Sequence, residues 1–480
     1  MLKHNRKKNL ILGFISLCCL STYSQEHNVS AGYQKPSDPQ VLQNLETWQD
    51  LKFGLFMHWG TYSQWGIVES WSLCPEDEGW TQRKPQHGET YYDYIKNYEN
   101  LQKTFNPIDF NPQKWADAAK AAGMKYVVFT TKHHDGFAMF DTKESDYKIT
   151  SPNTPFSINP KADVTKEIFS TFRNEGFKIG AYFSKPDWHT EYYWWPYFPP
   201  KDRNVNYDPL KYPDRWEKYK TFTYNQINEL TSNYGKVDIL WLDGGWVRPF
   251  KTIDQNVEWQ RTIKVEQDID MDKIGGMARK NQPGIIVVDR TVPGEWENYV
   301  TPEQAIPEHP LDIPWESCIT MGNSFSYVPN DHYKPTQKIV ETLVKIISRG
   351  GNYLLNIAPG PNGDFDQAAY DRLQELSSWV AINESAIYAT RAVTPYHEGD
   401  YYYTRSKDYK TINVFHLSED NDYQQPETFQ FTIPENFEVK DVKLLGYKKK
   451  IKWTKNNDTM VVKVPKMDAK YATVIQLITK

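Results

Sequence analysis

At 480 residues the chain is longer than one ordinary domain and can form a large barrel together with a smaller second domain. Its formal net charge is −5 and no basic run dominates its body, which argues against a nucleic-acid-binding protein. Aromatic residues make up 15% of the chain. This content is typical of ligand-stacking surfaces and of well-filled cores alike, so composition alone does not choose a function.

The first 24 residues have the pattern of a signal peptide. A basic start, residues 3–8, precedes the apolar run 10–20, and Thr22 and Ser24 suit a cleavage point after residue 24. The apolar run is too short to span a bilayer, and a lipid anchor on one of its cysteines is disfavoured because bulky residues stand where a small one is needed. We therefore predict an exported protein, periplasmic or secreted, without a membrane span.

Two cysteines, Cys74 and Cys318, remain after that cleavage. Two thiols are too few for a structural zinc site, and cysteines so far apart in the chain cannot be paired from the sequence. They indicate neither a metal centre nor a redox function.

From about residue 50 to about 390, short apolar runs alternate with longer helical stretches. Buried strands are predicted at residues 52–57, 126–129, 179–183, 237–242, 285–288 and 353–357. Helices are predicted at residues 112–122, 164–173, 216–234 and 336–348, and several are closed by a glycine. The alternation predicts an α/β fold, a closed (β/α)8-type barrel over residues 25–392. No glycine-rich phosphate fingerprint follows a strand, which weakens a dinucleotide-binding sheet as the alternative.

Polar side chains follow the predicted strands. The first strand ends at His58, the second at His133 and His134, the fourth at Asp243 and the fifth before Arg290. Because the carboxyl ends of the strands of such a barrel meet at one face, these residues should form one site.

The connection 190–214 is rich in aromatic residues and prolines and is predicted to lie over this site. It is either a wall that stacks on a ligand or a loop that folds its aromatic side chains against the barrel. Its sequence supports both interpretations.

Beyond residue 392 the pattern changes to short strands separated by polar turns. They are predicted at residues 401–403, 411–415, 429–433, 442–445, 460–464 and 473–477. The sequence therefore predicts a C-terminal β-sandwich domain over residues 393–480. The lysine-rich segment 448–452 is interpreted as an edge strand guarded by lysines, with an anionic-glycan contact as the alternative.

Asp243 stands at the end of the apolar run 237–242, between two tryptophans and before two glycines that leave room for a ligand. Such a carboxylate suits a nucleophile that faces a sugar ring, whereas the alternative is a cap for the next helix. Glycoside cleavage with retention needs a second carboxyl group about 5 to 5.5 Å away. Spacing does not choose among the downstream candidates Glu295, Glu297, Glu303, Glu308 and Glu316.

Six short motifs in order resemble the α-L-fucosidases of glycoside hydrolase family 29. They are residues 52–60, 132–137, 241–244, 289–290, 315–316 and 350–356. The resemblance spans the barrel and the trailing β-domain, and it implies that Asp243 is the nucleophile. Thr301-Pro302-Glu303 resembles the family's acid/base segment, so Glu303 is the expected acid/base, with Glu316 as the runner-up. The chain departs from the family pattern in an insertion between Trp246 and Gly284 and in the spacing of Glu69 and Trp71.

The resemblance also implies which side chains surround the sugar. The residues expected to bind the sugar hydroxyls are His58, Glu69, Trp71, His133 and His134. Arg290 is expected to reach the site, and Trp241 to flank the nucleophile. Tyr182 and Phe325 are expected near the C5 methyl group.

The residues themselves leave a zinc site open as an alternative, because imidazoles near carboxylates bind zinc. Against it, His133 and His134 should point to opposite sides of an extended chain, and the motif lacks helical histidine spacing. We therefore expect no metal and no other cofactor.

Two functions are compatible with this pattern. The first is a retaining, exo-acting α-L-fucosidase that removes terminal fucose from glycans, and the second is a fucosylated-glycan-binding protein that has lost catalysis. Both expected catalytic carboxylates, Asp243 and Glu303, are present, which favours the enzyme.

Overall fold

The computed structural model describes residues 32–479 apart from 78–80, 82, 419–422, 436 and 468. The predicted signal peptide, residues 1–24, lies outside this part of the chain. No helix within the described ranges combines the length and the apolar character that crossing a bilayer requires.

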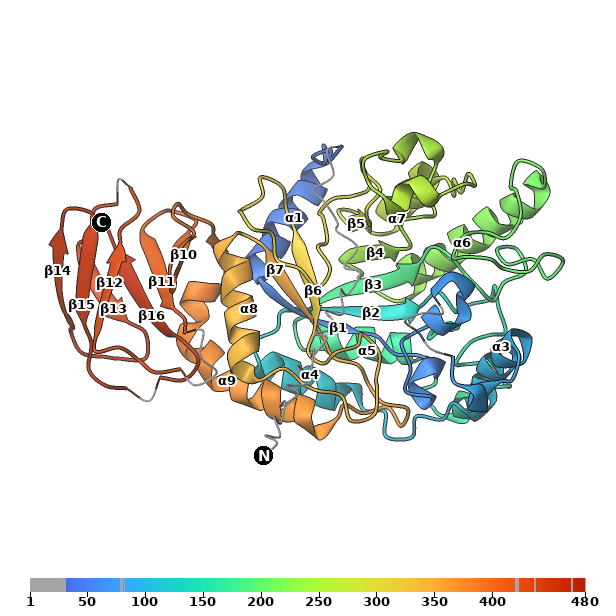
Figure 1. Ribbon diagram of the computed structural model, residues 1–480, viewed down its shortest axis with the longest axis horizontal. Helices are drawn as coiled ribbons and strands as arrows, with labels where there is room; N and C mark the ends of the chain where they lie inside the picture. Colours follow the sequence, from blue (N-terminus) through green and yellow to red (C-terminus); the bar gives the residue numbers. More distant parts are fainter. Residues whose placement is uncertain are drawn as a thin grey trace, which may run out of the picture.

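The centre of the molecule is a curled sheet of parallel strands in the order β5-β4-β3-β2-β1-β7-β6 (Figure 1). Its members are β1 (Phe53–Met57), β2 (Tyr126–Lys132), β3 (Lys178–Ser184), β4 (Ile239–Asp243), β5 (Ile286–Asp289), β6 (Glu316–Thr320) and β7 (Asn352–Asn356). Every residue of β1, β2, β5, β6 and β7 is buried. Such continuous burial is expected of parallel strands that are covered on both faces.

Residues 296–304 bridge the two edge strands, β5 and β6. On one side the backbone N–H of Asn298 donates to the carbonyl of Val287 at 2.9 Å, and on the other the N–H of Glu316 donates to the carbonyl of Val300, also at 2.9 Å. The segment runs antiparallel to β5 and then turns to run parallel to β6. The predicted barrel fold is therefore confirmed, with seven regular strands in the described chain and an irregular segment at the remaining position.

The helices alternate with these strands, as predicted, and several surround the sheet (Figure 1). They are α1 (Pro39–Leu51), α3 (Tyr91–Glu99), α4 (Pro112–Ala121), α5 (Val164–Asn174), α6 (Pro213–Asn233), α7 (Met271–Asn281), α8 (Thr336–Ser348) and α9 (Gln367–Ile387). Short 3-10 helices occur in the connections: η1 (Thr61–Gln64), η2 (Trp71–Leu73), η3 (Pro75–Asp77), η4 (Pro85–His87), η5 (Asn100–Thr104), η6 (Pro155–Ile158), η7 (Phe250–Thr252) and η8 (Trp259–Thr262).

Local sequence signals explain the ends of α4 and α5. Asn111 and Asp163 cap the two N-termini by accepting backbone N–H groups, and Pro112 occupies the first turn of α4. Gly123 and Gly176 follow the C-termini with φ of +88° and +90°, a conformation in which a side chain would be strained.

The C-terminal part is a sandwich of two antiparallel sheets, as predicted. The larger sheet contains β8 (Thr390–Arg391), β9 (His397–Glu398), β10 (Tyr401–Ser406), β11 (Thr411–His416), β13 (Asp441–Leu444) and β16 (Thr473–Ile478), and the smaller contains β12 (Thr428–Thr432), β14 (Lys452–Asn456) and β15 (Thr459–Lys463). Apolar side chains from both sheets share one core. The lysine run 448–450 precedes β14, an edge strand of the smaller sheet. The domain boundary at residues 392/393 stays a prediction.

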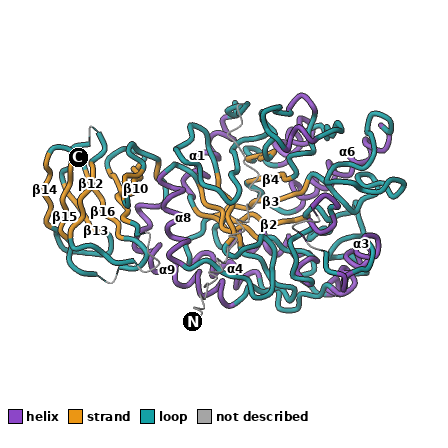
Figure 2. Tube along the Cα trace, viewed as in Figure 1, coloured by secondary structure: helices purple, strands orange, loops and turns teal. Residues whose placement is uncertain are grey.

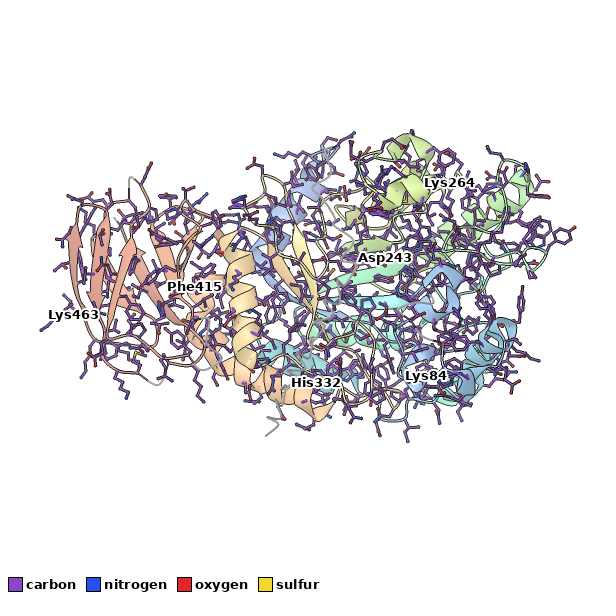
Figure 3. The ribbon with its side chains drawn as sticks, viewed as in Figure 1. Lys84, Asp243, Lys264, His332, Phe415 and Lys463 are labelled. Atoms are coloured by element: carbon purple, nitrogen blue, oxygen red, sulfur yellow. The ribbon has the colours of Figure 1, made fainter. Side chains whose placement is uncertain are left out.

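Helices α8 and α9 lie between the sandwich and the barrel (Figures 1 and 2). Trp379 Nε1 donates to the carbonyl of Ala472 at 3.2 Å, and Gln337 Nε2 donates to the carbonyl of Tyr471 at 2.9 Å. Figure 3 labels Phe415 within the C-terminal sandwich and Asp243 within the barrel. The strand ends of the barrel, rather than the second domain, therefore position the candidate site.

Candidate active site

Asp243 is the last residue of β4 and lies opposite Ser184 of β3 in the parallel register. Its Oδ2 accepts a hydrogen bond from the Tyr182 hydroxyl at 2.8 Å, and its Oδ1 accepts one from Arg290 Nη1 at 3.1 Å. Burial alone would raise the pKa of Asp243, but the charge of Arg290 and smaller contributions from its other neighbours hold it well below its usual range. The carboxylate is thus ionised at neutral pH, as a nucleophile must be.

Glu303 contacts the same arginine. Arg290 donates from Nη2 to Glu303 Oε2, while its Nε donates to Thr301 Oγ1 at 3.0 Å and its guanidinium lies 4.9 Å from the centre of the Trp241 ring. The side chains of Glu303 and Asp243 are 27% and 17% exposed. One guanidinium therefore connects the two carboxylates, and both remain accessible to a ligand.

Glu316, the other acid/base candidate, is fully buried beneath the site. Its carboxylate accepts hydrogen bonds from the Tyr126 hydroxyl at 2.5 Å, the Tyr299 hydroxyl at 3.2 Å and Trp241 Nε1 at 3.3 Å. Burial raises its pKa to about 7. These contacts make Glu316 a support for the Trp241 ring rather than a group that faces the opening.

The histidines are arranged to accept hydrogen bonds from a ligand. His58 Nδ1 lies 2.7 Å from Asn356 Oδ1, and His134 Nδ1 lies 2.7 Å from Ser184 Oγ. Because Ser184 already donates to the carbonyl of Pro186 and Asn356 Oδ1 is an acceptor, both Nδ1 atoms must donate, which leaves each Nε2 as an acceptor. Burial lowers the pKa of both rings to about 4, so they are neutral at pH 7.

His133 and His134 lie side by side, so our expectation that they point to opposite sides is wrong. Their ring centres are 4.2 Å apart, because the chain leaves β2 in a turn in which the N–H of Gly136 donates to the carbonyl of His133. Gly136 has φ of +77°. The alternation of an extended strand does not apply in such a turn. Burial also lowers the pKa of His133, and its Nδ1 lies 2.5 Å from Ser70 Oγ.

This arrangement brings ligand atoms of His133, His134 and Asp243 within 4.8 Å of one another, close enough to share a metal ion. The Arg290 guanidinium lies 3.1 Å from Asp243 Oδ1. A divalent cation bound to Asp243 would stand beside this positive charge and be repelled by it, which disfavours a metal here. His134 Nε2 is buried, lies 3.7 Å from Asp243 Oδ2, and has no hydrogen-bond partner among the described residues. A sugar hydroxyl fits that place without added positive charge.

We predict that chelation leaves activity unchanged. Dialysis against EDTA should alter the turnover rate by less than about twofold, because Arg290 already supplies a positive charge beside Asp243. Adding Zn²⁺ back serves as the control. Activity lost on chelation and restored by zinc, or a stoichiometric metal in the purified protein, would make the histidines metal ligands.

Glu69, Trp71 and Phe325 line the same region. Glu69 Oε1 accepts the backbone N–H of Ser326 at 2.7 Å, and burial raises the pKa of Glu69 to about 8. The Trp71 ring meets the His134 ring edge-on at 5.1 Å, and Phe325 lies 4.9 Å from His58. The structure thus brings these residues to the region of Asp243. Tyr182, expected near the C5 methyl group, also donates its hydroxyl to Asp243.

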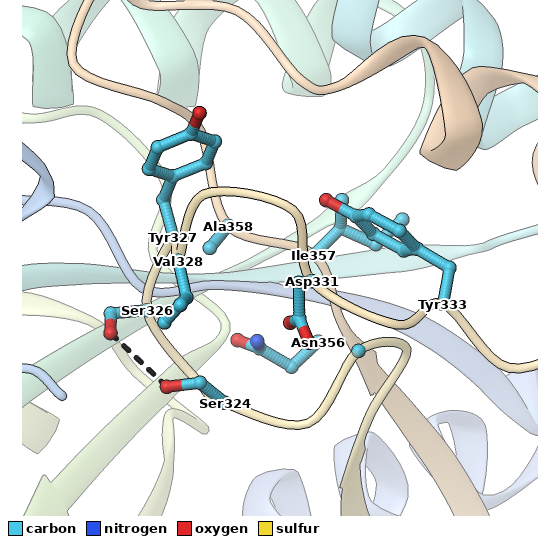
Figure 4. A pocket seen from close by; sticks show the side chains of 10 residues that line it. Ser324, Ser326, Tyr327, Val328, Asp331, Tyr333, Asn356, Ile357 and Ala358 are labelled. Carbon is cyan, nitrogen blue, oxygen red and sulfur yellow. Dashed lines mark hydrogen bonds between the residues drawn. The ribbon is translucent and has the colours of Figure 1, made fainter. Parts of the chain in front are cut away.

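A small pocket next to these residues is lined in part by Ser324, Ser326, Asp331 and Asn356 (Figure 4). Ser324 and Ser326 are joined by a hydrogen bond of 3.2 Å. Ser326 holds Glu69, and Asn356 holds His58. The pocket therefore belongs to the supports of the candidate site.

The aromatic connection 190–214 packs its side chains against the barrel and on itself, as the second interpretation expects, whereas stacking on a ligand stays a prediction. Trp194 stacks on Trp188 at 5.2 Å, and Trp188 in turn lies 5.1 Å from His134, so this part packs behind a residue of the candidate site. The next residue, Trp195, packs instead within the loop itself, against side chains that include Phe198.

The sequence places Ser184, Asp289 and Asn356 at strand ends, where the site is expected, but it does not indicate what they hold. Ser70, Ser184 and Asn356 fix the histidine rings, and Lys185 forms a buried ion pair with Asp289. Nothing in the sequence distinguishes Ser70 or Lys185 from an ordinary core position. Cys74 and Cys318 are buried and do not pair with each other.

Comparison with known proteins agrees with this geometry. Residues 20–385 match the family model for α-L-fucosidase. The chain is 26% identical over 453 residues to the plasma α-L-fucosidase of Homo sapiens, which covers 88% of this chain and 87% of that protein.

Solved structures show the same fold. The α-L-fucosidase isoenzyme 1 of Paenibacillus thiaminolyticus superposes with a TM-score of 0.73 at 28% identity, covering 92% of this chain and 99% of that one. A family 29 α-L-fucosidase of Bacteroides thetaiotaomicron, solved as a trapped covalent intermediate with 2-fluoro-fucosyl fluoride, gives a TM-score of 0.71 at 22% identity, covering 94% and 98%. The family resemblance seen in the sequence is thus confirmed: this chain belongs to the α-L-fucosidases of glycoside hydrolase family 29 and is a glycoside hydrolase.

Proposed function

We propose that the protein is a retaining, exo-acting α-L-fucosidase that removes terminal α-L-fucose from oligo- or polysaccharides through a covalent fucosyl-enzyme intermediate. The observation that carries this proposal is the contact of Asp243 and Glu303 with the two terminal nitrogens of Arg290. A double displacement requires two neighbouring carboxyl groups of this kind. The trapped intermediate of the Bacteroides thetaiotaomicron relative supports the same step here.

In the first step Asp243 attacks the anomeric carbon while Glu303 protonates the departing oxygen. The first step therefore uses Glu303 in its protonated form, and the proton it gives up leaves with the alcohol, so Glu303 is a carboxylate when the ester on Asp243 has formed. The same residue can then take a proton from water in the second step.

The sugar itself is held by neutral groups. The Nε2 atoms of His58 and His134 accept hydrogen bonds from its hydroxyls, as does His133, and Glu69 and Trp71 complete that side. Tyr182, Trp241 and Phe325 supply the apolar and aromatic surface. The predicted signal peptide supports a place of action in the periplasm or outside the cell. The presence of both carboxylates favours this enzyme over an inactive glycan-binding protein.

The stereochemistry of the product tests this mechanism. Two displacements at the anomeric carbon should release α-L-fucose first, and β-fucose should appear only later by spontaneous mutarotation. Proton NMR of the first minutes of hydrolysis distinguishes the anomeric signals. Early release of the β-anomer would replace the covalent mechanism with a single displacement by water.

A further inference from the structure

Tyr299 stands where the irregular segment 296–304 changes neighbours. Just before it, the backbone N–H of Asn298 donates to the carbonyl of Val287 in β5, and just after it the carbonyl of Val300 accepts the N–H of Glu316 in β6, both at 2.9 Å. The chain bends at Tyr299, and the Tyr299 side chain is fully buried. The direction in which the segment leaves this bend therefore depends on what the Tyr299 ring packs against.

The Tyr299 ring packs against Trp48 of α1. The two ring centres are 4.0 Å apart and the ring planes are 12° from parallel, which is a stacked pair. Both rings belong to the apolar cluster inside the barrel that also contains Trp241. Trp48 Nε1 is buried and has no hydrogen-bond partner in the part of the chain that the structure describes. Trp48 therefore acts on Tyr299 through its ring.

Helix α1 holds Trp48 in a fixed position across the barrel. Asn44 Nδ2 donates to the carbonyl of Gly284, just before β5, at 2.7 Å. Asn352 Nδ2, at the start of β7, donates to the carbonyl of Trp48 itself at 2.8 Å. These two bonds tie the helix to strands on both sides of the segment 296–304, so the surface that Trp48 offers to Tyr299 does not depend on that segment.

Tyr33, which precedes α1, contacts the same bend. Its hydroxyl donates to the backbone carbonyl of Asn298 at 3.2 Å. Burial, and beyond it the charge of Glu297, raise the pKa of Tyr33 to about 12, so the hydroxyl keeps its proton and remains a donor at neutral pH. Two residues from the start of the described chain therefore hold the bend, one through a ring and one through a hydrogen bond.

The residues that follow the bend reach the candidate site. Thr301 Oγ1 and Glu303 Oε2 both accept hydrogen bonds from Arg290, which also contacts Asp243. Glu303 lies only four positions after Tyr299, whereas Asp243 lies on β4, a strand paired on both sides. A change at the bend would therefore displace Glu303 while leaving Asp243 in place.

Building on the proposed function, in which Glu303 is the proton donor, we propose that Trp48 and Tyr33 are positioning residues for that donor. They fix the bend at Tyr299 and so set where the Glu303 carboxyl group stands relative to the departing oxygen. Proton transfer requires hydrogen-bond reach between these two groups, so a displacement of about 1 Å is enough to slow it strongly. Attack by Asp243 on the anomeric carbon does not depend on this placement.

Two substrates test this inference: a fucosyl disaccharide, whose sugar alcohol needs a proton, and a dinitrophenyl α-L-fucoside, whose leaving group does not. Trp48→Leu removes the stacked ring and should lower the ratio of kcat/KM for the disaccharide to that for the dinitrophenyl fucoside by about tenfold. A role in folding alone would lower both values together, because it changes only the amount of active protein, and would leave the ratio at its wild-type value.

Two further variants make the test specific. Trp48→Phe keeps an aromatic ring against Tyr299 and should keep the ratio within about twofold of the wild-type value. Tyr33→Phe removes one hydroxyl from a half-buried side chain and should lower the ratio by about threefold, as expected for one lost hydrogen bond. Because this change is small, it tests the proposal even if Trp48→Leu does not fold.

Val41→Ala is the matched control, because Val41 is buried on the same helix about two turns before Trp48. It should lower the thermal stability and leave the ratio unchanged. Unchanged ratios in both Trp48→Leu and Tyr33→Phe, or an equal fall of the ratio in Val41→Ala, would overturn the positioning role. A wild-type protein that cleaves neither substrate would instead refute the proposed function, so the two failures are distinguishable.

Discussion

Replacing Asp243 with glycine should lower kcat on an aryl fucoside by about a thousandfold or more, because no other group stands at the anomeric carbon to form the covalent intermediate. Asp243→Asn should lose kcat similarly while fucose still binds, since the histidines and Glu69 remain. Added azide should enter the space left in Asp243→Gly and attack the substrate once, giving β-fucosyl azide. Initial rates and NMR of the azide product measure both effects.

Asp238→Asn is a suitable control for this experiment. Asp238 immediately precedes β4, away from its carboxyl end, where its Oδ2 accepts the N–H of Ile179 at 2.9 Å. The same substitution there removes a charge without touching the site. Near-normal turnover by Asp243→Gly without azide would show that another residue is the nucleophile.

The second large effect is expected from Glu303→Ala. A sugar alcohol is a poor leaving group and needs a proton, whereas dinitrophenolate departs without one. The first-step rate on fucosyl oligosaccharides should therefore fall by roughly a hundredfold to ten-thousandfold, while that on a dinitrophenyl fucoside should change far less. Azide should then intercept the β-linked intermediate and yield α-fucosyl azide, which NMR distinguishes from the β-anomer.

Glu316→Ala should behave differently. Its loss removes the acceptor for Trp241 Nε1 and for two buried tyrosine hydroxyls, so both substrates should slow alike and the protein should lose stability. Comparing leaving-group dependence in the two variants assigns the roles. Accumulation of α-fucosyl azide with Glu316→Ala but not with Glu303→Ala would exchange them.

The sequence predicts the barrel well wherever burial and residue type agree. The strands β1, β2, β3, β4, β5 and β7 read as apolar runs because both faces of a parallel strand are covered. The strand β6 was not predicted, because it begins with the polar residues Glu316 and Ser317 and ends with Thr320. The burial of these side chains depends on partners far away in the chain. The carboxylate of Glu316, for example, is satisfied by Tyr126, 190 positions earlier.

The same limit applies to the site. A single sequence indicates that polar residues at neighbouring strand ends converge, and it points to Asp243, His58 and His134. It does not reveal that a turn at Gly136 brings His133 to the same side, since that depends on one φ angle. Nor does it reveal that the backbone carbonyl of Arg203 accepts the indole N–H of Trp188 from its own connection and that of Trp246 from the connection after β4.

The fold fixes the positions of the two carboxylates, Asp243 and Glu303, to different degrees. Asp243 ends a strand paired on both sides, so shifting it by one residue would disturb the register of β3 and β5. Glu303 instead lies on the irregular segment 296–304, which is joined to β5 and β6 by isolated bridges rather than by a regular ladder. Insertions or deletions there would relocate the proton donor without altering any regular strand. Under the proposed roles, the position of the nucleophile is therefore fixed by the register of the sheet, whereas the position of the proton donor depends on the path of one irregular segment.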